Sequence, residues 1–163
     1  MNILRVHNQK IFNGTNPVHL QGVNLGGWLM PEGYIMGAPN RPVMDFRRNF
    51  IRALGKKALG ELETAFRENY ITEKDFALIA SFGFNVIRLP FHYGLVETKP
   101  FSYSKEGVGY LDRAIRWAQK HGLRVILDMH AAPGAQNHDW HSDSDGKARF
   151  WTSPSSQKRA IEL

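Results

Sequence analysis

Three short apolar segments, each followed by a long polar loop and then a helical segment, constrain the fold of this chain most. They span residues 18–24, 84–89 and 124–129. Segments of this kind are typical of strands in a parallel sheet that is covered by helices. The turns before the second and third segments, at Gly83 and Gly122, are tight, whereas the loops after the segments are long. This asymmetry is typical of a barrel whose active site is built from the loops that follow its strands.

The sequence therefore predicts an α/β fold, namely the first three βα units of a partial (β/α)₈ TIM barrel with adjacent parallel strands in chain order. Residues 3–12 predict a small N-terminal hairpin that precedes it. We expect residues 1–163 to form the N-terminal portion of a single, truncated barrel domain. A doubly wound sheet is the structural alternative, but it normally has a Gly-rich phosphate turn, and Trp28 directly after Gly26-Gly27 would obstruct a pyrophosphate.

Apolar spacing and cap signals place helices between the strands. Helical stretches are predicted near residues 44–54 and 58–68, with a break at Gly55. Residues 72–75 (TEKD) fit a capping box that begins another helix. Apolar residues recur at helical spacing through residues 110–118, which predicts a helix before the third strand.

Composition excludes several classes of function. The chain has no cysteine, so it has no disulfides and no thiolate metal sites. The formal net charge is +6, but the densest basic run, Arg47 to Lys57, is typical of a solvated helix face, so we predict no nucleic-acid partner. No apolar run approaches the length of a membrane span, so we predict no membrane partner. No apolar signal-peptide region follows Met1 to Arg5, which predicts a cytoplasmic location if Met1 is the natural start and otherwise leaves the compartment open.

Polar side chains stand where the predicted strands end. Asn24, Arg88 and His130 each lie at the C-terminal end of one segment, and in a barrel these ends share one rim. Because side chains alternate along a strand, Arg88, Asp128 and His130 are expected to face the barrel axis. Arg88 and Asp128 form either a purely structural pair or one that also orients an active site, and His130 is either a core histidine or part of that site. Their place at strand ends favours the site.

Aromatic and hydrogen-bonding side chains crowd the loops after these strands. Sugars present apolar CH faces flanked by hydroxyls, so aromatic rings beside polar groups suit them. The alternative for the tryptophans is that they only plug the bases of the loops. The candidate residues of these loops are Trp28, Glu32, Tyr34, His92, Tyr93, Gln136, Asn137, Asp139, Trp140 and His141.

A metal-dependent hydrolase is a further alternative. Imidazoles of His130, His138 and His141 could bind zinc. The signal is not specific, because a His-x-x-His pair in a loop is common by chance and no HExxH motif is present. We therefore predict no metal and no other cofactor.

The sequence resembles glycoside hydrolase family 5, particularly its exo-β-1,3-glucanase-like and cellulase-like members. Three ordered motifs carry this resemblance: Gly22–Leu29 (GVNLGGWL), which Glu32 and Tyr34 follow, Phe84–Pro90 (FNVIRLP) and Leu127–Asn137 (LDMHAAPGAQN). The resemblance extends from about Leu4 onward. It implies that Arg88 supports the catalytic nucleophile, that His130 belongs to the active site and that Glu32 and Tyr34 contact the sugar. The full set of substrate-binding residues is predicted as Glu32, Tyr34, Trp28, Asn24, His92, Asn137, Trp140 and His141.

The resemblance also implies catalytic glutamates that this sequence does not place. Family members are retaining enzymes with an acid/base glutamate after an asparagine on the fourth strand and a nucleophilic glutamate on the seventh. Residues 124–129 are the last predicted strand, and no glutamate here follows an asparagine. We therefore expect no catalytic residue in this chain and a β-glucan hydrolase fragment whose partners are β-glucan and the missing C-terminal half of the barrel. The alternative is a non-catalytic carbohydrate-binding remnant.

Overall fold

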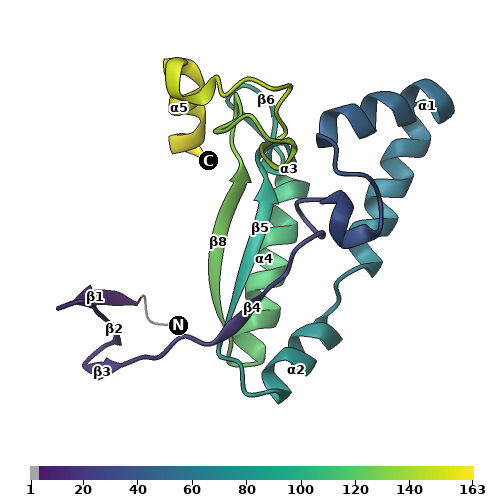
Figure 1. Ribbon diagram of the computed structural model, residues 1–163. Coiled ribbons are helices and arrows are strands. Elements are labelled where there is room, and N and C mark those ends of the chain that lie inside the picture. The colour runs from purple at the N-terminus through teal and green to yellow at the C-terminus, as the bar shows by residue number, and fades with distance from the viewer. Residues whose placement is uncertain (1–3) are drawn as a thin grey trace.

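The centre of the molecule is a parallel sheet of three strands, seen in a computed structural model that describes residues 4–163. The strands are β4 (Gly22–Asn24), β5 (Val86–His92) and β8 (Arg124–Ala131), and they are adjacent in that order. Both pairings are parallel, and the C-terminal ends of the strands point the same way (Figure 1). The predicted strand order and direction are confirmed.

The two longer strands run further than the sequence predicts. We expected Pro90 to end β5, but the strand continues to His92. The reason lies on the side of β4, where the Leu25 N–H donates to the Arg88 carbonyl at 2.9 Å. Pro90 faces the same side two residues later, beyond the end of β4, so its missing N–H removes no ladder hydrogen bond. Likewise β8 continues beyond its predicted end at residue 129 and includes His130 and Ala131.

The helices follow the predicted order. Helix α1 (Val43–Asn69) follows a short 3₁₀ turn, η1 (Gly33–Met36), and contains a kink at Gly55, whose φ of 88° favours glycine. Helix α2 (Glu73–Ser81) begins with the expected capping box, in which the Asp75 carboxylate accepts the Thr72 N–H at 2.7 Å. Helix α4 (Lys105–Lys120) precedes β8. Helices α2 and α4 lie along one side of the sheet (Figure 1).

The hydrophobic core lies between the sheet and these helices. Ile87 and Leu89 of β5 have no exposed area, and Phe76 of α2 fills the space next to them. Ala114 and Ala118 of α4 are also fully buried. Small residues one helical turn apart allow α4 to approach the sheet closely.

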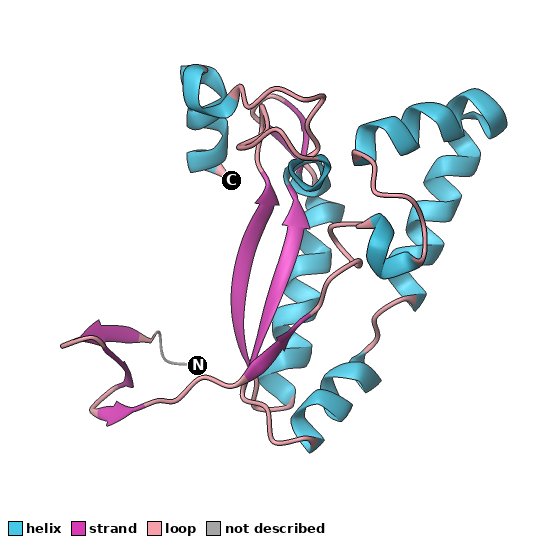
Figure 2. Ribbon diagram, in the orientation of Figure 1, coloured by secondary structure: helices cyan, strands magenta, loops and turns pink. Residues whose placement is uncertain are grey.

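The outer edge of β8 lacks such cover. Leu127 is on the face of β8 opposite Asp128 and His130, yet it is 49% exposed. Strand β8 is an edge strand, and α5 (Pro154–Glu162) lies beyond its C-terminal end (Figure 2). Ile126, on the opposite face, is 48% exposed, as expected for an uncovered barrel interior. Val86, on the same face of β5, is buried.

Small elements complete the chain. An antiparallel sheet of β1 (Arg5–His7), β2 (Lys10–Asn13) and β3 (Asn16–Pro17) precedes the central sheet. The predicted hairpin at residues 3–12 is its first half, with residue 3 outside the described residues. The loop after β5 holds helix α3 (Tyr93–Val96) and the strands β6 (Glu97–Lys99) and β7 (Ser102–Tyr103). The loop after β8 holds 3₁₀ turns η2 (Trp140–Ser142) and η3 (Phe150–Thr152).

Candidate active site

A hydrogen-bonded cluster joins the C-terminal ends of the three central strands. Arg88 Nη1 donates to Asn24 Oδ1 at 2.9 Å, and Arg88 Nη2 lies 2.5 Å from Asp128 Oδ2. His130 Nδ1 lies 3.0 Å from that Nη2 and 2.9 Å from Asp128 Oδ2. The fork of one arginine thus ties β4, β5 and β8 together, and the His130 Nε2 atom is left to face outward.

Glu32 approaches this cluster from the loop after β4. Its carboxylate oxygen Oε1 lies 3.9 Å from His130 Nε2, and the residue is only 6% exposed. Within residues 4–163, no protein group donates a hydrogen bond to this carboxylate. Its oxygens are open to the adjoining cavity, where water or a ligand can donate hydrogen bonds to them. The carboxylate and His130 therefore present hydrogen-bonding atoms to the same small space.

Aromatic rings form the outer wall of that space. Tyr34 packs edge to face on Trp140, with ring centroids 5.9 Å apart. Trp140 in turn contacts His141, whose ring centroid lies 5.7 Å from that of His130. The cavity so formed measures about 260 Å³, and we call it the rim pocket; its lining residues are Asn24, Glu32, Tyr34, Arg88, His130, Trp140 and His141.

Three residues expected at the sugar site do not line the rim pocket. Asn137 lies one step behind it, with its amide nitrogen 2.8 Å from His141 Nε2, and so orients that ring. Trp28 is 1% exposed and stacks on Trp117 in the core, and its Nε1–H donates to the Arg67 carbonyl at the end of α1. Trp28 therefore plugs the base of its loop, which is the alternative given above for the tryptophans. Its indole N–H satisfies one of the carbonyls that the end of a helix leaves free. His92 is buried, and its Nε2 atom is hydrogen-bonded to Asp143 Oδ2.

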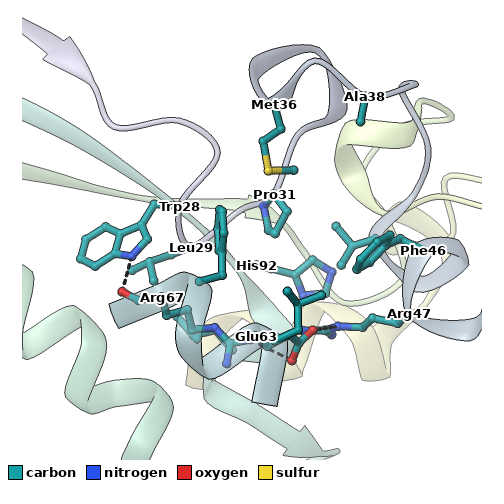
Figure 3. A pocket seen from close by; sticks show the side chains of 14 residues that line it. Trp28, Leu29, Pro31, Met36, Ala38, Phe46, Arg47, Glu63, Arg67 and His92 are labelled. Atoms are coloured by element: carbon teal, nitrogen blue, oxygen red, sulfur yellow. Dashed lines mark hydrogen bonds and ion pairs between the residues drawn. The ribbon is translucent and has the colours of Figure 1, made fainter. Parts of the chain in front are cut away.

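Trp28 and His92 instead line a second cavity of about 300 Å³, the apolar pocket, between the loop after β4 and α1 (Figure 3). Its walls are mostly aliphatic and aromatic, and Figure 3 shows Pro31 and Phe46 facing its centre. At one edge Glu63 accepts hydrogen bonds from Arg47 Nε at 2.6 Å and Arg67 Nη2 at 3.1 Å.

Two residues that support the rim pocket were not assigned that role from the sequence. Gln136 donates through Nε2 to the His130 carbonyl at 2.5 Å and accepts the Ala132 N–H at 3.1 Å, which fixes the end of β8. Its place in the third motif was a usable signal. Asp143 pairs with His92 across 51 residues of sequence, and no local pattern indicates this contact.

An ion pair anchors the helix that follows the rim-pocket loop. Arg159 of α5 donates to Glu97, and the side chain of Glu97 is 1% exposed. The Arg159 guanidinium, aided by the Phe101 N–H, holds the pKa of the Glu97 carboxyl below its ordinary value, although burial opposes this shift. The pair fixes where the loop between β8 and α5 ends.

The histidines of the metal alternative are not brought together. His138 is exposed and its Nδ1 contacts the Gly146 carbonyl at 3.0 Å, whereas His130 and His141 line the rim pocket. Between residues 4 and 163, no cluster of three or more His, Asp or Glu side chains could hold a metal ion. No helix in the same range is long and apolar enough to cross a membrane.

Comparison with known proteins identifies close sequence relatives. The chain is 38% identical over 167 residues to the beta-xylosidase of Phanerodontia chrysosporium, which covers 100% of this chain and 35% of that protein. It is 42% identical over 130 residues to the glucan 1,3-beta-glucosidase of Blumeria graminis, covering 75% of this chain and 30% of the relative. The chain thus spans about a third of the length of these curated relatives.

A solved structure and a family model also match this chain. The crystal structure of AoRut matches with a TM-score of 0.70 and 27% identity, over 88% of this chain and 41% of that chain. A family model described as cellulase (glycosyl hydrolase family 5) matches residues 36–157, which is well over half of the 163 residues. The chain therefore belongs to glycosyl hydrolase family 5 and forms part of that family's barrel.

Proposed function

We propose that this chain supplies the sugar-binding part of an active site for retaining hydrolysis of β-glucans. The observation that carries the proposal is the rim pocket, in which a buried carboxylate without protein donors faces aromatic rings. Sugar hydroxyls would donate to Glu32, and an apolar sugar face would pack on Tyr34 and Trp140. The name of the Blumeria graminis relative supports a glucan as the substrate.

The cluster behind the pocket suits a positioning role in this reaction. In our proposal Arg88, held by Asn24 and Asp128, orients the nucleophilic carboxylate, and His130 donates or accepts a hydrogen bond at the sugar that is cleaved. Retaining hydrolysis needs one carboxyl as general acid and a second as nucleophile, roughly 5 Å apart. No cofactor takes part in such a mechanism.

We further propose that the chain alone binds the sugar and does not cleave it. Among residues 4–163, Glu32 is the only glutamate that lines the rim pocket. Asp128 is held by Arg88 and His130 rather than directed at a sugar. Other glutamates lie elsewhere in pairs with basic residues, as Glu68 does with Arg113 and Glu97 with Arg159. The two glutamates of the reaction would come from a longer polypeptide or a partner that completes the barrel.

The test separates binding from turnover. The 163-residue chain should bind laminaribiose by calorimetry and release no glucose from laminarin. Glu32→Gln keeps the size of the side chain, removes the charge and should weaken binding about tenfold, equivalent to ~1.4 kcal/mol. Glu61→Gln, an exposed position on α1, is the matched control and should bind as the unchanged chain does.

The outcomes distinguish the alternatives. Clear glucose release by the purified chain would contradict the fragment interpretation. Tighter binding of xylobiose than of laminaribiose would move the substrate class towards that named for the Phanerodontia chrysosporium relative. The chain could also bind sugar while longer polypeptides that contain it hydrolyse none. This result would favour the non-catalytic binding remnant.

A further inference from the structure

A buried histidine–aspartate pair lies directly behind the aromatic wall of the rim pocket. His92 ends β5, and Asp143 follows the η2 turn in the loop after β8. His92 Nε2 lies 2.8 Å from Asp143 Oδ2, and each side chain is 6% exposed. Neither residue lines the rim pocket, so the sugar-binding residues do not account for this pair.

Each polar atom of the pair is engaged by a different part of the chain. His92 Nδ1 accepts the N–H of Gly94 at 2.9 Å, so the ring proton is on Nε2, which donates to Asp143. The other carboxylate oxygen of Asp143 accepts the N–H of Met44 at 2.8 Å, in the first turn of α1. A negative charge is favourable at that end of a helix. One carboxylate therefore joins β5, α1 and the loop after β8.

The backbone of Asp143 ends the turn that carries two rim-pocket rings. Its N–H donates to the Trp140 carbonyl at 3.0 Å and closes the η2 turn, Trp140–Ser142. Its φ of 56° and ψ of 38° lie in the left-handed region, which costs free energy for a residue with a side chain. The two side-chain hydrogen bonds of Asp143 offset that cost and hold the turn in place.

We propose that His92 and Asp143 are positioning residues that hold Trp140 and His141 against the sugar subsite. This inference rests on the proposed sugar-binding function of the rim pocket. Tyr34 meets Trp140 edge to face, so a displaced η2 turn would also leave Tyr34 without its neighbour. The pair thus sets the shape of the aromatic wall from behind, without touching the sugar.

The chemistry of the pair requires a carboxylate at position 143. An asparagine there replaces one acceptor oxygen with an NH₂ group of the same size. If that group faces Met44, it meets the donor N–H. If it faces His92, the ring must move its proton to Nδ1, which then meets the N–H of Gly94. In either orientation of the amide, Asp143→Asn therefore makes two N–H donors face each other with no acceptor between them.

The experiment uses the 163-residue chain labelled with 5-fluorotryptophan, because its four tryptophans report on different regions. Trp140 reports on the aromatic wall, Trp28 and Trp117 report on the core, and Trp151 is 66% exposed. Resonances are assigned with Trp→Phe variants. In Asp143→Asn the fluorine resonance of Trp140 should move toward that of Trp151, while the two core resonances stay. Laminaribiose affinity should fall about fivefold, as expected for the loss of one aromatic contact.

Two further variants complete the design. Asp145→Asn removes an exposed carboxylate from the same loop, where it pairs with Arg149, and should leave all four resonances and the affinity unchanged. His92→Gln keeps one donor and one acceptor and should move the Trp140 resonance less than Asp143→Asn does. If Asp143→Asn unfolds the chain, so that the core resonances are lost, His92→Gln decides the question.

The results separate this inference from the function on which it rests. An unchanged Trp140 resonance in a folded Asp143→Asn or His92→Gln variant overturns the positioning role. If the unchanged chain binds no laminaribiose but Asp143→Asn still displaces Trp140 alone, the sugar-binding proposal fails and the positioning of the wall by this pair stands. A displacement together with weaker binding supports both.

Discussion

Two cavities of similar size lie at the same end of the sheet, yet their walls differ in kind. The rim pocket, about 260 Å³, collects the polar groups that stand at the strand ends. The apolar pocket, about 300 Å³, collects aliphatic and aromatic side chains from the loop after β4 and from α1 (Figure 3). Both contain residues that follow strands closely in sequence. Proximity to a strand end therefore does not by itself assign a residue to the site.

Side chains in strands and side chains in loops obtain their directions in different ways. Asn24 and Arg88 are strand residues, so the pleat fixes their direction towards the barrel axis. Trp28 comes after β4 has ended, and its loop turns outward against α1 and α4. Residues in the strands inherit a direction from the sheet, whereas residues in the loops depend on tertiary contacts.

The largest expected effect tests whether Trp28 belongs only to the core. Trp28→Ala should lower the free energy of unfolding by about 4 kcal/mol, because it removes a buried indole and leaves a cavity. Trp151→Ala, at a 66% exposed site, should cost about 1 kcal/mol or less and serves as the control. Urea unfolding measures both. A stable Trp28→Ala chain with weakened laminaribiose binding would return Trp28 to the sugar site.

The next effect concerns the acid response of the ion pair that anchors α5, which lines neither pocket. Apolar contacts do not titrate, but Glu97, which anchors α5, has a pKa held below its ordinary value of 4.5 by Arg159. Its contribution to stability is therefore complete above pH 4.5 and is lost as the pH falls through the lowered pKa. Glu97→Gln should destabilise the chain by about 3 kcal/mol at neutral pH, since it leaves a largely buried arginine without its partner.

The measurement for Glu97 is the unfolding free energy from pH 7 to pH 3, with Glu61→Gln as an exposed control. The unchanged chain and the control should lose stability steeply below pH 4.5. Glu97→Gln should show a flatter profile, because the group that titrates has been removed. An equally steep profile for Glu97→Gln would show that other carboxylates dominate the response.

A smaller effect tests the arginine fork of the rim pocket. Arg88→Lys keeps the charge but cannot reach Asn24, Asp128 and His130 together from one planar group. Laminaribiose affinity should fall about tenfold, or ~1.4 kcal/mol. Unfolding should change by less than about 1 kcal/mol, because the Arg88 side chain is 40% exposed. Arg124→Lys, at the opposite end of the central sheet, should change neither measurement.

The sequence predicted the sheet well because its signals are local. Short apolar segments, the capping box at Thr72 and the break at Gly55 each depend on neighbouring residues, and all three are present. The same logic placed Asn24, Arg88 and His130 at one rim, since strand ends and the pleat decide their positions. Glu32 and Tyr34 were candidates because of their place in the loop after the first strand, and the resemblance to a known family assigned them to sugar contact.

The parts that the sequence did not predict depend on distant contacts. His92 and Asp143 are 51 residues apart, and nothing near either residue indicates the other. Leu127 fits the pattern of a covered strand residue, but whether a helix covers it depends on where α5 lies. Trp28 satisfies both the core and the sugar-site pattern, and only the packing of α1 and α4 decides between them.

The smallest effect separates an exposed sugar-facing ring from an exposed ring elsewhere. Tyr34 is 60% exposed and packs on Trp140 by its edge, so its removal should change the free energy of unfolding by less than about 1 kcal/mol. Tyr34→Ala should still weaken laminaribiose binding about fivefold, because one aromatic contact to the sugar face is lost. Tyr103→Ala removes a tyrosine that is 49% exposed on β7, outside the rim pocket, and should leave the affinity unchanged. Equal affinities for the two variants, measured by calorimetry under the same conditions, would remove Tyr34 from the sugar site and leave Trp140 as its aromatic wall.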